Sequence, residues 1–175
     1  CNLKEKKIFK SLKNIKEVDG RLELVRKFQN NIKVFIDYAH TPDALSKVLQ
    51  SLRSNYGKNI SLVFGCGGDR DKMKRPLMAK IANQYSRKIY VTDDNPRNEE
   101  PKKIRNVILK KIDSIKSFNI GDRAKAIKKA ILNAERNEVI LIAGKGHENQ
   151  QIYKNKLLNI SDKQIVKNLK LSKKI

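Results

Sequence analysis

The sequence contains little cysteine, little histidine and no tryptophan. Its two cysteines, Cys1 and Cys66, lie far apart without a second cysteine or histidine at metal-ligand spacing, so neither a disulfide framework nor a structural zinc site is indicated. The two histidines belong to no serine–histidine–acid set, which argues against nucleophilic catalysis. We interpret Cys66 as a small packing residue.

Long hydrophobic runs are also missing. No apolar stretch approaches the roughly 20 residues that a transmembrane helix needs. The first ten residues lack the apolar segment and cleavage site of a signal peptide, and a chain that begins at Cys1 is expected to be a piece of a longer one. We therefore expect a cytoplasmic protein without a membrane partner.

Negative charge is scarce relative to positive charge. Lys and Arg number 40 against 18 Asp and Glu, for a formal net charge of +22. Binding of nucleic acid through counterion release is one explanation. We favour AT-rich codon usage, because Lys, Ile and Asn are all abundant and the lysines are spread along the chain without interleaved aromatics. We expect no specific nucleic-acid partner, although the lysine-rich tail from Lys154 could attract polyanions nonspecifically.

The apolar residues that are present fall into a regular alternation. The 175 residues are 39% hydrophobic, enough for one domain plus a fragment. Nearly continuous apolar blocks at 32–36, 60–64, 89–92 and 139–143 are typical of strands buried on both faces. Helical patterns cover 42–56, with Thr41 as the expected N-cap, and 76–85, 101–112 and 123–136. The alternation predicts an α/β fold with an open, mostly parallel sheet.

A polar loop follows each of these strands, at residues 37–42, 65–71, 93–97 and 144–148. Ligands of open α/β sheets bind at the carboxyl ends of the strands. Four such loops at one edge of one sheet therefore predict a single shared binding site.

The glycine-rich loops do not fit the common phosphate-binding motifs. A dinucleotide fingerprint starting at Gly65 would need glycine or alanine at position 70, which is Arg70. A Walker loop would need Ser or Thr after Lys145, where the chain has Gly146. Judged alone, the glycines at 65, 67 and 68 are also explained by a tight turn that needs positive φ.

The charged residues of the loops favour recognition of a small zwitterion. Arg70 and Arg97 can pair with carboxylates through two parallel hydrogen bonds. Asp94, Asn95 and Glu148 can accept hydrogen bonds from an ammonium group. His40 and His147 are as readily structural as functional.

Four loop sequences resemble one known family. The strings DYAHTPDAL, VFGCGGDRDKMKRPLM, VTDDNPRNEEP and LIAGKGHENQ, in this order and spacing, resemble the C-terminal domain of the Mur ligases, within them the diaminopimelate-adding branch. The resemblance implies that residues 1–18 end a central ATP-binding domain and its linker. It also implies that residues 19–175 form the C-terminal, amino-acid-binding domain, with a Rossmann-like sheet and helices on both faces.

The resemblance further implies an ATP-dependent, amide-forming ligase of cytoplasmic peptidoglycan synthesis. In this family the glutamate carboxylate of UDP-N-acetylmuramoyl-L-alanyl-D-glutamate is phosphorylated, and the amine of meso-diaminopimelate attacks the acyl phosphate. ATP and Mg²⁺ are held mainly by the central domain, while the C-terminal domain binds diaminopimelate and closes over ATP. We therefore expect the fragment alone to be inactive, with no catalytic residue and no metal ligand of its own.

Carried over position by position, the resemblance assigns two sets of residues. The nucleotide contacts of this domain fall on Arg21, Asp37 and His40. The diaminopimelate contacts fall on Arg70, Asp94, Asn95, Pro96, Arg97, Gly144 and Glu148.

Three alternatives stay open at this point. The first is a relative that adds lysine or glutamate, of which the lysine-adding one is disfavoured by Arg97, because lysine has no distal carboxylate for that guanidinium. A folate-polyglutamating relative is disfavoured by the DNPR string at 94–97. A basic, nucleic-acid-binding α/β domain is the third.

Overall fold

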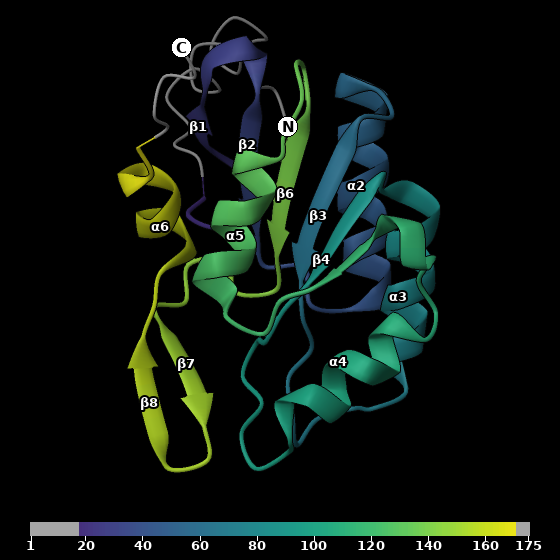
Figure 1. Ribbon diagram of the computed structural model, residues 1–175, viewed down its shortest axis with the longest axis vertical. Coiled ribbons are helices and arrows are strands. Elements are labelled where there is room, and N and C mark those ends of the chain that lie inside the picture. Colours follow the sequence, from purple (N-terminus) through teal and green to yellow (C-terminus); the bar gives the residue numbers. More distant parts are fainter. Residues whose placement is uncertain (1–17, 171–175) are drawn as a thin grey trace, which may run out of the picture.

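The computed structural model describes residues 18–170, so the predicted domain end at residues 1–18 lies almost entirely outside the described residues. A six-stranded sheet has the order β1-β2-β6-β3-β4-β5 (Figure 1). A separate hairpin follows it in the chain. The strands are β1 (Glu23–Lys27), β2 (Lys33–Asp37), β3 (Ile60–Phe64), β4 (Lys88–Val91), β5 (Ser117–Asn119), β6 (Val139–Ala143), β7 (Gln150–Tyr153) and β8 (Lys156–Asn159).

The predicted open, mostly parallel sheet is confirmed. Strands β2, β6, β3, β4 and β5 pair in parallel along the sheet, and β1 joins the edge antiparallel to β2. Every residue of β3 and β6 is buried, as their continuous apolar sequences indicated.

Helices cover both faces of this sheet, as predicted. One hydrophobic cluster joins the strands to α2 (Pro42–Tyr56), α3 (Lys74–Tyr85) and α4 (Pro101–Leu109). A second cluster on the other face joins them to α5 (Arg123–Leu132) and α6 (Asp162–Asn168). Figure 1 shows that α2, α3 and α4 group together on one side of the sheet and α5 and α6 on the other. The helices therefore leave the ends of the strands uncovered.

The helix boundaries follow local chemistry. Thr41 caps α2 by accepting a hydrogen bond from the Ala44 N–H at 3.3 Å, and Gly57 ends the helix with φ +84°, so the predicted bounds 42–56 are confirmed. The other predicted bounds are partly wrong. Helix α3 starts two residues before Pro76, which its first turn tolerates, while α4 and α5 end before 112 and 136.

Four elements were not predicted: β1, β5, the β7–β8 hairpin and α6. Among the described residues, no helix combines the length and the apolar character needed to cross a membrane.

Candidate functional site

The carboxyl ends of β2, β3, β4 and β6 lie side by side, because these strands are parallel neighbours in the sheet. The four polar loops that follow them meet around a cavity of about 500 Å³. A larger, more apolar hollow lies between α5, α6 and β8, but none of the four loops lines it. The residues around the loop cavity are Tyr38, His40, Thr41, Gly65, Cys66, Gly67, Arg70, Asp71, Lys74, Asp94, Asn95, Arg97, Gly144 and Glu148.

The loops after β3 and β4 pack against each other at backbone distance. The Gly68 N–H donates to the Asn95 carbonyl at 2.9 Å, and a Cβ on Gly68 would lie only 1.9 Å from the Pro96 carbonyl oxygen. Gly65, Gly67 and Gly68 do not have positive φ, so the explanation by a left-handed turn is wrong. Close approach of two backbones requires the glycines at 65 and 68 instead.

A buried arginine holds these two loops together. Arg75, at the start of α3, donates through Nη2 to Glu99 Oε1 at 2.8 Å and to the Gly67 carbonyl at 3.1 Å. Its Nη1 reaches Glu99 Oε2 at 3.0 Å, which completes a two-bond pair. The Arg75 hydrogen bonds lower the pKa of Glu99 from 4.5 to about 2. The cavity therefore has one wall made of two linked loops.

Arg97 lies in the second of these loops with an unusual backbone. Its φ is +50°, and its N–H and C=O bond to the Ile152 carbonyl and the Lys154 N–H at 3.0 and 2.7 Å. Nη1 donates to the Gly68 carbonyl at 2.9 Å and to the Asn95 carbonyl at 3.3 Å. Nε and Nη2 make no hydrogen bond to any described residue, so this side of the guanidinium is available to a ligand.

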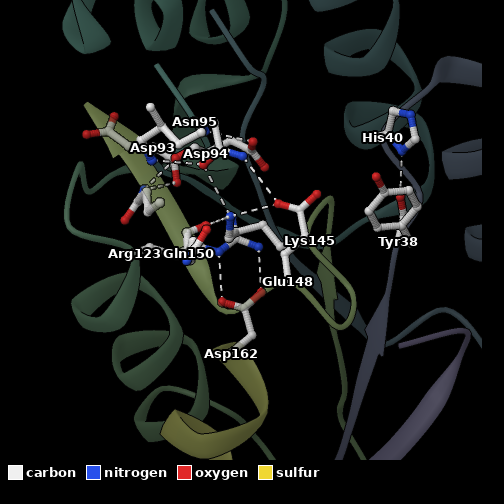
Figure 2. Close-up of polar contacts among 12 residues, drawn as sticks. Tyr38, His40, Asp93, Asp94, Asn95, Arg123, Lys145, Glu148, Gln150 and Asp162 are labelled. Carbon is white, nitrogen blue, oxygen red and sulfur yellow. Dashed lines mark hydrogen bonds and ion pairs between the residues drawn. The ribbon is translucent and has the colours of Figure 1, made fainter. Parts of the chain in front are cut away.

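A network around Lys145 forms another wall (Figure 2). The ammonium of Lys145 contacts Glu148 Oε2 at 3.1 Å, Asn95 Oδ1 at 3.3 Å and the Gln150 carbonyl at 2.5 Å. The Asn95 amide also donates to Glu148 Oε2 at 3.3 Å. One oxygen of the Glu148 carboxylate is thus fixed by two donors.

Asp94 and Arg70 add charge of both signs to the cavity. Asp94 Oδ1 accepts from the Asn95 N–H at 2.7 Å, while Oδ2 faces Gly144, where a Cβ would come within 3.0 Å. Gly144 has φ +111°, so a side chain there would be both strained and in contact with the carboxylate. Arg70 is exposed at the cavity rim. Lys74 is held there by the carbonyl of His40 at 2.9 Å.

The β7–β8 hairpin supports the loop after β4 from outside the cavity. Gln151 Nε2 donates to the carbonyls of Asp93 and Asp94 at 3.1 and 2.6 Å, and the Ile152 N–H donates to Asn95 Oδ1 at 3.0 Å. The Tyr153 hydroxyl donates to Asp93 Oδ2 at 2.9 Å, and burial together with this bond raises the pKa of Tyr153. The hairpin fixes the loop through backbone and side-chain contacts alike.

A second cluster surrounds the ring of Tyr38, which lines the cavity together with His40. The guanidinium of Arg21 lies 4.4 Å from the ring centre, His147 stacks at 5.7 Å and His40 meets the ring edge at 4.7 Å. Figure 2 shows Tyr38 and His40 apart from the Lys145 network. Asp37 is buried behind this cluster, where its two oxygens accept from the N–H groups of Leu22 and Ala39 at 2.6 and 2.7 Å.

Comparison with known protein families shows which family has this fold and loop arrangement. The family model described as "Mur ligase, glutamate ligase domain" matches residues 20–146. This chain belongs to the Mur ligase family.

Individual relatives are named for one activity. The chain is 45% identical over 161 residues to a "UDP-N-acetylmuramoyl-L-alanyl-D-glutamate--2,6-diaminopimelate ligase" of Rickettsia bellii, covering 91% of this chain and 33% of the relative. A Buchnera aphidicola protein of the same name is 50% identical over 153 residues, covering 87% and 31%. A solved structure of a ligase of that name superposes with a TM-score of 0.78 at 37% identity, over 88% of this chain and 32% of the other. The chain thus spans about a third of the length of these relatives.

The Mur ligase domain brings most of the predicted site residues to one place. All of the predicted diaminopimelate contacts line the cavity except Pro96, which is buried beside Gly68. Of the predicted nucleotide contacts, His40 lines the cavity, while Arg21 and Asp37 lie next to it around Tyr38.

Several residues that shape the site were missed in the sequence. Lys145 lies two residues after the fully buried strand β6, but its sequence context suggests only a Walker lysine, which the motif does not support. Arg75 lies in a helix among other basic residues, and Gln151 lies in an unpredicted hairpin. Nothing in the local sequence distinguishes these two residues from exposed polar residues.

Metal binding gains no support from this domain. The part of the chain that the structure describes contains no group of three His, Cys, Asp or Glu residues able to hold an ion.

Proposed function

We propose that this chain is the amino-acid-binding domain of an ATP-dependent ligase that adds meso-diaminopimelate to UDP-N-acetylmuramoyl-L-alanyl-D-glutamate. The names of its relatives support this assignment. The observation that carries it is the charge arrangement of the loop cavity. Two guanidinium groups, of Arg70 and Arg97, face the same cavity as the carboxylates of Asp94 and Glu148.

This arrangement complements meso-diaminopimelate better than lysine. Diaminopimelate carries a carboxylate and an amine at each end, so a pocket for its distal end needs both a cation and an anion. Arg97 supplies the cation, whose Nη1 is bonded to its own loops while Nε and Nη2 have no hydrogen-bond partner among the described residues, and Glu148 supplies the anion. Lysine has no distal carboxylate, so its binding would leave a partly desolvated guanidinium without a partner. This disfavours lysine as the substrate.

The role of this domain in the reaction is to position the nucleophile. When the distal end is held by Arg97 and Glu148, the reacting amine projects from the cavity toward the domain that carries the activated glutamate. Holding the amine at a fixed place raises its effective concentration, and closing the loops over it excludes water from the acyl phosphate. No group of this chain needs to form a covalent bond.

Nucleotide binding from this side is part of the proposal. The half-buried Tyr38 ring, with the guanidinium of Arg21 and two imidazoles against it, forms an aromatic and cationic group that suits a purine and an anionic phosphate chain. Each Asp37 oxygen accepts one backbone N–H and keeps a further lone pair for a ribose hydroxyl. ATP would supply the phosphoryl group that activates the glutamate carboxylate. We place Mg²⁺ and the other ATP contacts in the remaining domains of the protein.

The proposal also covers location and partners. Peptidoglycan precursors of this type are nucleotide-linked, so we place the protein in the cytoplasm, with UDP-N-acetylmuramoyl-L-alanyl-D-glutamate bound through its other domains. We propose no specific nucleic-acid or membrane partner.

The test is a substrate comparison with the full-length protein. Amide formation on UDP-N-acetylmuramoyl-L-alanyl-D-glutamate is measured with ATP and with meso-diaminopimelate, lysine or glutamate in parallel. We expect kcat/KM for meso-diaminopimelate to exceed that for lysine by at least ~10²-fold, the discrimination typical of an unpaired buried charge. Equal use of lysine would overturn the assignment in favour of the lysine-adding branch.

A further inference from the structure

Lys145 is one of the most deeply buried charged residues of the domain. Its side chain is 0% exposed, although it directly follows Gly144 at the cavity. A buried ammonium is costly unless each of its three N–H groups has an acceptor. Here the acceptors come from three different segments: Asn95 in the loop after β4, Glu148 in the loop after β6, and Gln150 at the start of the hairpin.

The same ammonium determines which way the neighbouring amide points. Asn95 Oδ1 accepts from Lys145 and from the Ile152 N–H, so its Nδ2 is the atom that faces Glu148. Both donors, the ammonium and the amide, then meet on Oε2 of Glu148. Figure 2 shows Lys145, Asn95 and Glu148 drawn together by these bonds.

The other oxygen of this carboxylate is left for a ligand. Oε1 of Glu148 accepts no hydrogen bond from any described residue. The Glu148 side chain is 34% exposed and lines the cavity. The carboxylate is therefore anchored by one oxygen and presents the other in a fixed orientation.

We propose that Lys145 is a positioning residue for substrate specificity: by fixing Oε2 of Glu148, it aims Oε1 at the distal ammonium of the amino acid. This inference rests on the proposed function. Lys145 itself touches no substrate, and its effect passes through Glu148. Without the ammonium, Asn95 loses one of the two bonds that its Oδ1 accepts and Glu148 loses its counter-charge, so the carboxylate is free to turn toward solvent.

A purely structural role of Lys145 makes a different prediction. Its bond to the Gln150 carbonyl also ties the hairpin to the loop after β6, so its loss would loosen the whole site. Loosening would impair every amino-acid substrate alike. Positioning of Glu148 would impair only substrates that carry a distal ammonium.

The experiment uses the full-length protein with two amino acids, meso-diaminopimelate and 2-aminopimelate, which keeps both carboxylates but lacks the distal amine. We expect Lys145→Met to raise KM for meso-diaminopimelate about tenfold or more, the loss typical of a hydrogen bond to a charged group. We expect KM for 2-aminopimelate to change less than about threefold. Lys145→Gln, which keeps an N–H donor but no charge, should change both constants in the same sense but less.

A double-mutant cycle tests the route through Glu148. Glu148→Gln should reproduce the selective loss, and adding Lys145→Met to it should raise KM for meso-diaminopimelate little further. Glu148→Gln is shape-conserving, so it gives a result even if the Lys145 variants fail to fold. A Glu148→Gln enzyme that treats both amino acids like the wild type overturns the proposal, and so do fully additive effects in the cycle.

Lys88→Met is the matched control. Lys88 is also a largely buried lysine, bonded to the Asn133 carbonyl at 2.9 Å and to Glu135 and Glu138. It is the first residue of β4, so it lies at the amino ends of the parallel strands, opposite the cavity. Lys88→Met should lower thermal stability, and any change in KM should be the same for meso-diaminopimelate and 2-aminopimelate. An equal KM increase for both amino acids in the Lys145 variants would overturn the positioning role. Failure of the wild type to add meso-diaminopimelate would instead overturn the proposed function.

Discussion

At the scale of single residues, three buried cations connect the site to the rest of the fold. Arg75 ties two loops together, and Lys145 ties a third loop to the hairpin. Arg123, at the start of α5, donates to both oxygens of Asp162 at 2.8 and 2.7 Å and to the Ala143 carbonyl at 3.1 Å. Each cation fixes the backbone next to a strand end, which keeps the loops in one arrangement.

The Arg123–Asp162 pair makes a prediction about stability. Both side chains are 0% exposed, so Asp162→Asn leaves a buried guanidinium without its counter-charge. We expect the free energy of unfolding of the 175-residue chain to fall by about 3–5 kcal/mol in urea titrations.

The exposed pair between Asp43 and Lys47 provides the control for that measurement. Its atoms are 2.9 Å apart, but both side chains are about three-quarters exposed, so Asp43→Asn should cost less than ~1 kcal/mol. Equal losses for the two variants would show that the buried pair contributes no more than a surface one.

At the scale of elements, the sequence predicted the strands that bear the site. Strands β2, β3, β4 and β6 are apolar along their length because helices cover both faces, and this gives a strong signal. Strand β1 at the sheet edge is only half-buried, and β5 has three residues, so neither has a clear pattern. The hairpin turns at Lys154, which has φ +46° without a glycine to mark it.

The site was predictable to the same extent. Charged residues in four loops after four parallel strands implied one cavity, and most of the residues selected by the resemblance line it, whereas Arg21, Asp37 and Pro96 do not. The supporting contacts were not predictable, because Arg75, Lys145 and Gln151 act through partners that are distant in sequence. Pairing of this kind depends on tertiary structure and leaves no local periodicity.

The linked loops after β3 and β4 predict a pH dependence of stability. Arg75 lowers the pKa of Glu99 from 4.5 to about 2. A lowered pKa in the folded state means that the contribution is complete above pH 4.5 and is lost as the pH falls toward 2. We expect wild type to be more stable than Glu99→Gln at pH 7, with the difference shrinking between pH 4.5 and 2.5 in urea titrations.

Glu100→Gln is the reference for this titration. Glu100, the residue after Glu99, is half-exposed and pairs with Lys103 at 3.5 Å, so the substitution should change stability little at either pH. A Glu99→Gln difference that stays constant from pH 7 to 2.5 would contradict the ion pair as its source.

At the scale of the whole molecule, the domain has its cavity on one side, at the carboxyl ends of the parallel strands. Two hydrophobic clusters cover the faces of the sheet, and the cavity opens where the parallel strands end. The chain spans about a third of the length of its relatives, and under the proposed function its cavity would hold the amino acid while the remaining groups of the reaction come from other domains. We assign no role in substrate binding to the net charge of +22.

This division of labour predicts that the 175-residue chain folds without ligase activity. Neither of its glycine loops fits a motif that holds ATP phosphates with Mg²⁺. We expect cooperative unfolding of the chain, but no phosphate release with ATP, UDP-N-acetylmuramoyl-L-alanyl-D-glutamate and meso-diaminopimelate. The full-length protein under the same conditions is the positive control. Substrate-dependent phosphate release by the chain alone would contradict the prediction.

We propose that Arg97 binds the distal carboxylate of diaminopimelate. This interaction is tested by the ratio of kcat/KM for meso-diaminopimelate to that for lysine in the full-length protein, before and after Arg97→Ala. We expect the ratio to collapse by about 10²-fold or more, with Arg97→Lys restoring little because a point charge cannot form the two-bond pair, and with KM for ATP within about twofold of wild type. An Arg97→Ala enzyme that keeps its diaminopimelate kinetics within about twofold would contradict the account.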